Sequence, residues 1–287
     1  MFALLALASA ACYGAADFLG GLTSKRASTL AIVVVSQLTG LLLLLVALPF
    51  LPAASPHKMD FVWGAVAGLT GGTGVALLYR ALAIGVMAVV APTTAVCAVV
   101  IPVLVAIGLG ERPGIVTIGG IVLAIIAIAL VSQSDHPEPV LHDQRAGSGA
   151  SAFASAFTLA LLSGVAIGLF FIALARTTTE AGVWPLVAAR AVSVSLFGAM
   201  AVLASQSLRL SGGTLRIVVA GGSLDMIANL LYMIATRSGP LSVVVTLASL
   251  YPASTVLLAR VVLHERLSWR QWVGVVCAMI AVMAIVR

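Results

Sequence analysis

Two carboxylates and one guanidinium group stand inside long apolar stretches of this 287-residue sequence. Asp17 lies in the first stretch, and Arg190 and Asp225 lie in two later ones. A charged side chain at the centre of a lipid bilayer costs about 2.5 to 3.5 kcal/mol on insertion scales, so such residues face a protein interior or water and find a partner. The chemistry open to them is ion pairing, proton transfer, or the binding of a polar or charged ligand.

The stretches that hold these charges are long enough to cross a membrane. The chain is 62% hydrophobic and 8% charged, whereas about a quarter of the residues in soluble domains are charged. About 20 apolar residues in a helix span a hydrocarbon core of about 30 Å. Alternation of apolar and polar residues, which membrane β-strands require, is missing from the runs. We therefore predict an all-α membrane protein with ten transmembrane helices, at 3–22, 29–51, 61–80, 86–109, 114–132, 153–175, 181–205, 214–236, 240–263 and 269–286.

One segment of the sequence occurs twice. Residues 79–131 recur as 232–285, and each copy passes from Leu-Leu-Tyr through a glycine and a paired valine to a charged corner. A repeat of this length is a unit of the fold. Because each half holds five helices, an odd number, the second half enters the membrane from the opposite side, which makes a five-plus-five inverted repeat. We assign 1–132 to the first repeat (helices 1–5), 133–152 to a polar connecting loop and 153–287 to the second repeat (helices 6–10).

Short motifs in both halves resemble a known family. They are Tyr79-Arg80-Ala81-Leu82, the corner Gly110-Glu111-Arg112 and its copy Glu265-Arg266, where His264 replaces the glycine. With the five-plus-five plan, they resemble the EamA-type transporters of the drug/metabolite transporter superfamily over essentially the whole chain. The resemblance implies a ten-helix carrier with a central cavity between its halves, helices 5 and 10 outside that cavity, and cytoplasmic termini. We interpret the Glu-Arg corners as structural caps of helix ends.

The charged residues inside the spans share one depth. At about 1.5 Å per helical residue, Asp17 and Gln37 lie about 12 Å below one face, and Arg190 and Asp225 about 12 to 16 Å below the other. One explanation is a structural Arg190–Asp225 ion pair. The other is a polar cavity at the repeat interface, where transporters place their sites. The candidate substrate-binding residues are Asp17, Gln37, Tyr79, Arg190, Asp225, Asn229 and Tyr232.

Glycines and prolines mark particular helices. The stretch from Gly68 to Gly74 has no following lysine and no preceding strand, so it predicts close helix packing rather than a phosphate loop. Pro92 and Pro102 lie in the predicted fourth helix, and Pro252 lies in the ninth. Proline kinks a helix and leaves carbonyls free, and such kinks serve as hinges or as packing bends.

These features favour a secondary carrier. We expect export or exchange of a small polar or amphipathic metabolite by alternating access, with a multidrug or cationic efflux carrier as the alternative. A nucleotide-binding loop is missing, so we expect a proton or ion gradient to supply the energy, with Asp17 and Asp225, the only carboxylates in the predicted spans, as proton carriers. An intramembrane enzyme would need a motif such as H-E-x-x-H or G-x-S-x-G, and the sequence contains neither. A channel typically has rings of one charge type, whereas the predicted spans hold one Arg and two Asp residues at similar depth. We expect no enzyme activity, cofactor or metal.

The charge pattern bears on partners and location. The 15 Lys and Arg residues, which give a net charge of +6, are scattered over short loops without a basic patch, so phospholipid headgroups explain them better than nucleic acid. We expect a multi-pass protein of the bacterial inner (plasma) membrane, a monomer or homodimer, whose partners are the bilayer and a small-molecule substrate. The Lys and Arg distribution favours an external N-terminus, and the family resemblance implies a cytoplasmic one.

Overall fold

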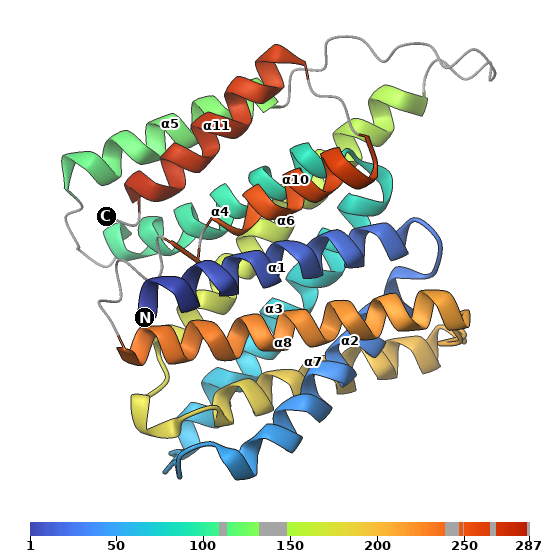
Figure 1. The fold of residues 1–287 in the computed structure, drawn as a ribbon, viewed down its shortest axis with the longest axis vertical. Coiled ribbons are helices and arrows are strands. Elements are labelled where there is room, and N and C mark those ends of the chain that lie inside the picture. The colour runs from blue at the N-terminus through green and yellow to red at the C-terminus, as the bar shows by residue number, and fades with distance from the viewer. Residues whose placement is uncertain (109–113, 132–147, 239–246, 249, 265–267, 286–287) are drawn as a thin grey trace.

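A computed structural model describes residues 1–108, 114–131, 148–238, 247–248, 250–264 and 268–285 (Figure 1). Within these ranges every regular element is helical. The two short 3-10 helices are η1 (Leu48–Phe50) and η2 (Thr179–Ala181). The α-helices are α1 (Phe2–Ser24), α2 (Thr29–Ala47), α3 (Lys58–Ile84), α4 (Met87–Gly108), α5 (Ile115–Val131), α6 (Ser148–Ala175), α7 (Trp184–Leu203), α8 (Gly212–Ser238), α10 (Tyr251–Val262) and α11 (Trp269–Ile285).

Six of the described helical segments are long and apolar enough to cross a membrane. Large apolar side chains are exposed on their outer surfaces, as expected where lipid replaces water as the solvent. Shorter apolar segments of 10 to 17 residues lie in α4, α5, α10 and α11. The prediction of an all-α membrane protein is confirmed, with these spans in the described residues: Phe2–Ser24, Thr29–Phe50, Lys58–Ile84, Ser151–Leu174, Trp184–Leu203 and Gly212–Ala235.

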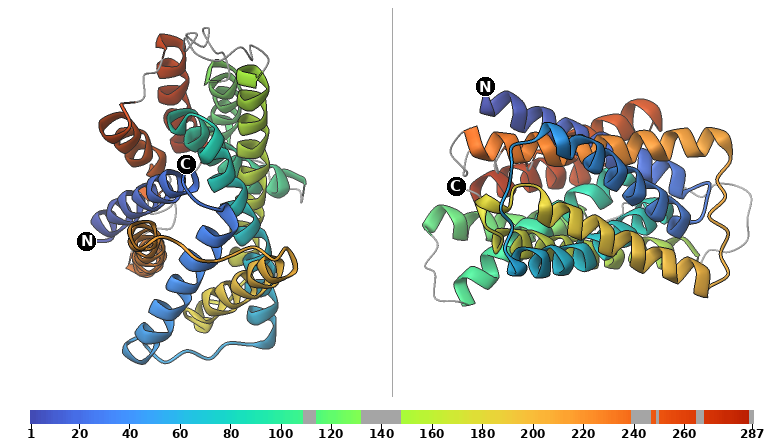
Figure 2. Two further views of the ribbon diagram at one scale, coloured as in Figure 1. Left: turned by 90° about the vertical axis from the view of Figure 1, so that its right-hand side faces the viewer. Right: turned by 90° about the horizontal axis from the view of Figure 1, so that it is seen from below.

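The helices are arranged as stacked layers (Figures 1 and 2). The pair α5 and α11 lies at one end of the molecule, and α11 also contacts α4. The pair α2 and α7 lies at the other end. Between them, α1 packs on α8 and α10, while α3 packs on α6 and α7. The polar residues of interest lie on these middle helices and on α2 and α7, so the α5–α11 pair is peripheral to them.

Close packing between helices depends on glycine at several points. An added Cβ at Gly68 of α3 would lie 2.7 Å from the Cα of Ala189 on α7, and one at Gly72 would lie 2.7 Å from the Oγ of Ser193. The Ser193 hydroxyl donates to the Gly68 carbonyl at 2.7 Å. The glycine-rich stretch therefore packs helix against helix, as predicted from its small residues.

The predicted ninth helix, 240–263, does not run unbroken. Residues 240–246 and 249 lie outside the described residues. Leu250 is in a turn whose N–H donates to the Leu247 carbonyl at 3.2 Å, and α10 begins at Tyr251. Pro252 occupies the first turn of α10, where a missing N–H is tolerated. The chain thus interrupts the helix ahead of this proline, whereas α4 continues through Pro92 and Pro102.

The predicted third helix began too late, at residue 61. In the structure α3 starts at Lys58 and carries Asp60 in its first turn, so Asp17 and Asp225 are not the only carboxylates inside a span. The buried Asp60 carboxylate accepts the N–H of His57 at 2.8 Å and the N–H of Thr178 at 2.7 Å. A capping carboxylate extends a helix beyond its apolar run. Because Thr178 lies between α6 and α7, Asp60 also fastens the two halves together.

Some sequence predictions concern residues outside those described. These include the Glu111-Arg112 and Glu265-Arg266 corners and most of the polar connecting loop. Helix α6 begins at Ser148, inside the predicted loop of 133–152. His264, which replaces the glycine of the second corner, is exposed and has a positive φ of 56°. A positive φ is the conformation that glycine adopts most readily, so the backbone at this corner has the geometry of a glycine position.

Candidate functional site

The two in-span charges Arg190 and Asp225 meet directly. Nη2 of Arg190, on α7, donates to Oδ2 of Asp225, on α8. Their side chains are 13% and 24% exposed, so neither is sealed from its surroundings. An ion pair holds both charges in a bundle that would otherwise exclude them. The predicted proximity of these residues is confirmed, and their assignment to a substrate site stays a prediction.

Neighbouring residues orient this pair. The side-chain amide of Asn229, one turn after Asp225 on α8, donates to the Asp225 backbone carbonyl at 2.7 Å and to its carboxylate at 3.5 Å. On α2, Gly40 lies next to the guanidinium, because an added Cβ there would lie 3.7 Å from Nε of Arg190, an ordinary van der Waals distance. Helices α2, α7 and α8 therefore build the Arg190–Asp225 site together.

Gln37 lies on α2 one turn before Gly40, and its side chain is nearly completely buried. Among the described residues its Oε1 atom has no hydrogen-bond partner. A buried acceptor left unpaired costs about 1 to 3 kcal/mol, and most such atoms in proteins bind a protein group or an ordered water. Gln37 thus supplies an unused acceptor one turn along α2 from Gly40, which lies next to Arg190.

Asp17 lies on α1, half-buried, facing the same polar region. Within the described part of the chain it makes no hydrogen bond or ion pair, although it interacts electrostatically with Asp225. Tyr79 of α3 comes against α1 at Gly20, where the tyrosine ring occupies the space that a Cβ would need. Tyr79 is 4% exposed and interacts electrostatically with Asp17. The structure therefore brings Tyr79 and Asp17 together.

Tyr13 is a residue that the sequence analysis did not select. It lies one turn before Asp17 on α1, and its ring meets that of Tyr251 edge to face, with centroids 6.3 Å apart. Tyr251 begins α10 and interacts electrostatically with Asp17. The polar groups within electrostatic reach of Tyr13 are Asp17, Arg190, Asp225 and Tyr232. Tyr13 is thus next to most of the predicted site.

Tyr232 is a partly buried residue that lies among apolar neighbours. It packs with a small cluster around Ala6 of α1 and Ala235 of α8, together with Leu5. It lies within electrostatic reach of Tyr13, which in turn lies near the charged residues. The structure therefore places four other predicted residues near the pair and leaves Tyr232 at the edge.

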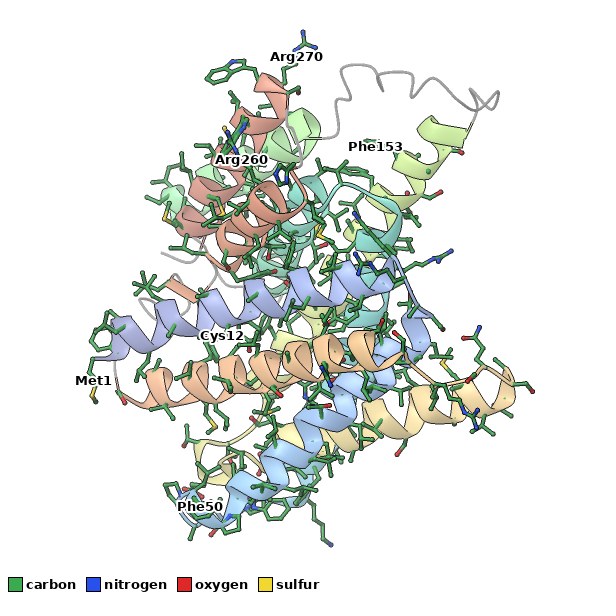
Figure 3. The ribbon with its side chains drawn as sticks, turned by 45° about the vertical axis from the view of Figure 1, so that its right-hand side comes forward. Met1, Cys12, Phe50, Phe153, Arg260 and Arg270 are labelled. Atoms are coloured by element: carbon green, nitrogen blue, oxygen red, sulfur yellow. The ribbon has the colours of Figure 1, made fainter. Side chains whose placement is uncertain are left out.

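The site lies in the middle of the molecule. Figure 3 labels Cys12, which precedes Tyr13 in the chain, on α1 between Arg270 at one end of the molecule and Phe50 at the other. Spacing could have found Tyr13, because residues four apart share a helix face and Asp17 is four residues later. No comparable signal pointed to Tyr251, because its position depends on the interruption before α10. Over the described residues no group of three or more His, Cys, Asp and Glu side chains could hold a metal ion.

Comparisons with known proteins define the class. The chain matches the model of the EamA-like transporter family over residues 1–133 and 154–287. A solved structure described as "Crystal structure of protein" is similar over 96% of this chain and 95% of that chain, with 17% identity and a TM-score of 0.59, which bears on the fold alone. No curated protein matches the sequence.

An all-α chain with apolar, membrane-length helices and charged residues among them is a multi-pass membrane protein of the transporter class. This chain belongs to the EamA-like transporter family, and the family match extends over both predicted repeats. The resemblance stated from the motifs is confirmed. Membrane transport, rather than catalysis, is the activity that the family indicates.

Proposed function

We propose that this protein is a secondary transporter that exports or exchanges a small polar or amphipathic metabolite across the bacterial inner membrane. The observation that carries the proposal is that Asp17, from the first half, lies within electrostatic reach of the Arg190–Asp225 pair, from the second. Intramembrane ionisable residues mark substrate or ion pathways, and carriers place them at the interface of their repeats.

Alternating access between inverted repeats is the proposed mechanism, and the helix contacts support it. If α1, α2, α3, α4 and α5 correspond in turn to α6, α7, α8, α10 and α11, the contact of α1 with α8 corresponds to that of α6 with α3. Likewise α2 with α8 corresponds to α7 with α3, and α1 with α10 to α6 with α4. The pairs α2–α7 and α5–α11 correspond to themselves. This is the exchange that a two-fold relation between the halves requires.

Two hydrogen bonds support the same correspondence at the level of atoms. The Ser9 hydroxyl on α1 donates to the Ala228 carbonyl on α8 at 2.8 Å. The Ser163 hydroxyl on α6 donates to the Gly74 carbonyl on α3, also at 2.8 Å. Ser163 lies 154 positions after Ser9, and Ala228 lies 154 positions after Gly74. The equal spacing supports the interpretation of the two bonds as copies of one contact, with the halves exchanged.

Energy for uphill transport would come from a proton or ion gradient. The guanidinium of Arg190 holds Asp225 and leaves Asp17 without an ion-pair partner among the described residues, so a proton arriving from one side can neutralise Asp17. The charge of the site then changes without any further cation. A carrier that rocks one repeat against the other can use this change to couple proton and substrate movement.

The proposal is tested by counterflow. Purified protein in liposomes preloaded with unlabelled substrate should accumulate labelled substrate from outside, which a carrier does and neither a channel nor an enzyme does. Substrates for the assay come from a thermal-stabilisation screen of amino acids, sugars and organic amines. If a compound that stabilises the protein leaves the liposomes at the same rate with and without external substrate, and no counterflow occurs, the carrier proposal is wrong.

A further inference from the structure

We infer that Asp17 and the rings of Tyr13, Tyr79 and Tyr251 form a binding site for an organic monocation, a protonated amine or a quaternary ammonium compound. The inference rests on the proposed transport function and names the substrate class of the same site. Three independent features of the structure support it: the one negative charge left among Asp17, Arg190 and Asp225, the tyrosine rings near Asp17, and the contacts that hold α10 against α1.

The charges of Asp17, Arg190 and Asp225 do not balance without one more cation. Arg190 is bound to Asp225, so the two cancel. Asp17 lies within electrostatic reach of that pair, but it has no ion-pair partner among the residues that the structure describes. An unpaired carboxylate is costly inside a membrane protein and either takes up a proton or binds a cation. The three charged groups together keep one negative charge for a ligand to neutralise.

The surroundings of Asp17 are aromatic. Residues three and four apart lie on one helix face, so Tyr13, Asp17 and Gly20 share a face of α1. The ring of Tyr79 packs at Gly20, on one side of Asp17. On the other side the ring of Tyr13 meets that of Tyr251 at an angle of 61°. Both Tyr79 and Tyr251 interact electrostatically with Asp17.

A carboxylate flanked by tyrosine rings fits an organic cation better than it fits a bare proton. Ring faces attract ammonium groups, and aromatic cages bind quaternary ammonium ligands. A proton needs only the carboxylate, so the three rings would have no role. A zwitterion would also need a cationic group for its own carboxylate, and Arg190 already holds Asp225. The arrangement therefore favours a ligand with one positive charge.

Tyr251 is fixed at this place by contacts between α10 and α1. The Thr255 hydroxyl donates to the Gly14 carbonyl at 3.1 Å, and the Ser254 hydroxyl donates to the Ala10 carbonyl at 3.2 Å. The turn at Leu250 puts Tyr251 at the start of α10. In many transporters, interrupted helices of this kind border the substrate site. Tyr251 is thus held rigidly at a helix interruption, facing Tyr13.

The test compares cations with neutral molecules of the same shape. Thermal unfolding of the purified full-length protein is followed with choline against 3,3-dimethylbutan-1-ol, and with phenethylamine against 2-phenylethanol. At least one cation should raise the unfolding midpoint in a saturable way, and its neutral counterpart should not. Glycine betaine, a zwitterion, should bind at least 10-fold more weakly than choline. If neutral molecules stabilise as well as the cations, or no cation stabilises, the inference is wrong.

Variants locate the binding. Asp17→Asn should weaken cation binding by about 10-fold or more, because the charge-assisted contact is lost. Tyr251→Phe, which keeps the ring, should bind within about threefold of the unaltered protein, whereas Tyr251→Leu should lose about 5- to 30-fold. Glu180→Gln removes an exposed carboxylate in η2 and is the matched control, with unchanged binding.

The outcomes separate this inference from the proposed transport function. Unchanged cation binding in Asp17→Asn would overturn the inference. If Asp17→Asn does not fold, the Phe and Leu variants of Tyr251 decide, because equal binding in both would also overturn it. Cation binding without counterflow of any compound would keep the inference and refute the carrier proposal. Counterflow of a neutral or anionic compound, with no cation binding, would refute the inference and keep the carrier proposal.

Discussion

The guanidinium of Arg190 on α7 donates to the carboxylate of Asp225 on α8, and the amide of Asn229 holds the same carboxylate from one turn away. The pair is neither fully exposed nor sealed, with side-chain exposures of 13% and 24%. A sealed pair would have only a structural role, and apolar residues of similar volume could replace it. A partly accessible pair can meet a ligand or water, and this difference is measurable.

The first prediction concerns variants of that pair. Removing one partner of a fully buried ion pair costs about 3 to 5 kcal/mol. Because water can reach this pair, we expect Arg190→Met and Asp225→Leu each to lower the free energy of unfolding by less than that range. Ligand-induced stabilisation and counterflow should be lost in both. The double variant should be folded and inactive, as measured by thermal unfolding and counterflow, and a double variant that transports normally would refute the site assignment.

Gln37 gives the second prediction. Its buried Oε1 has no partner among the described residues, so Gln37→Leu, of similar volume, removes an unpaired acceptor. We expect the free energy of unfolding to stay the same or to rise by at most about 1 to 3 kcal/mol. Counterflow should fall if the amide contacts substrate. A strong loss of stability would instead mean that the Gln37 amide is bound to protein or water in the resting state.

The third prediction uses two glycines on facing helices. At Gly68 an added methyl group would collide with the backbone of Ala189, so Gly68→Ala should push α3 from α7 and cost about 1 to 3 kcal/mol. At Gly198 of α7 an added methyl group would meet nothing within 4 Å. Gly198→Ala should therefore leave stability unchanged or raise it by about 1 kcal/mol through helix propensity. Chemical denaturation of both variants tests this, and equal effects would contradict the described packing.

The sequence predicted the helices well because apolar length is a strong signal, and it failed where length was not the deciding factor. The end of the second span was predicted at 51 and lies at Phe50. The start of the third was missed because Asp60 is charged, and only its capping bonds to His57 and Thr178 explain why it belongs to the helix. Hydropathy alone carries no information about such bonds.

The candidate site was predicted in part for a similar reason. Charges inside apolar runs stand out, so Asp17, Arg190 and Asp225 were found, and helical depth predicted that the last two could meet. Tyr79 and Tyr232 were also selected, but Tyr13 and Tyr251 did not stand out, because one aromatic residue in an apolar run looks like any other. Tyr251 reaches the site only because the chain turns at Leu250, and that turn is a property of the tertiary structure.

The fourth prediction concerns the contact that fastens the halves. The carboxylate of Asp60 accepts three hydrogen bonds, from the N–H of His57 and from the N–H and hydroxyl of Thr178. Asp60→Ala would leave both N–H groups without this acceptor, so the unfolding midpoint should fall. Thr178→Val removes only the hydroxyl bond, at 3.1 Å, and should lower the midpoint much less. The order of the two midpoints, measured in one detergent, is the test, and a reversed order would contradict the described contact.

The last prediction tests the inverted arrangement directly. The Ser28 hydroxyl, between α1 and α2, donates to Oε1 of Gln206, between α7 and α8, at 2.9 Å. The N–H of Ser55, between α2 and α3, donates to the Glu180 carbonyl, between α6 and α7, at 2.9 Å. The first bond therefore marks one membrane face, and the second marks the other.

Single cysteines placed at these four positions, in a variant with Cys12, Cys97 and Cys277 replaced by alanine, should fall into two classes with a membrane-impermeant thiol reagent. Ser28→Cys and Gln206→Cys should react from one side, and Ser55→Cys and Glu180→Cys from the other. The loops after α1 and α6 correspond in the two repeats, so Ser28→Cys and Glu180→Cys must differ if the repeats are inverted. Labelling of both from the same side of intact cells would rule out the inversion, and the side that labels Ser28→Cys would also fix which face holds the N-terminus.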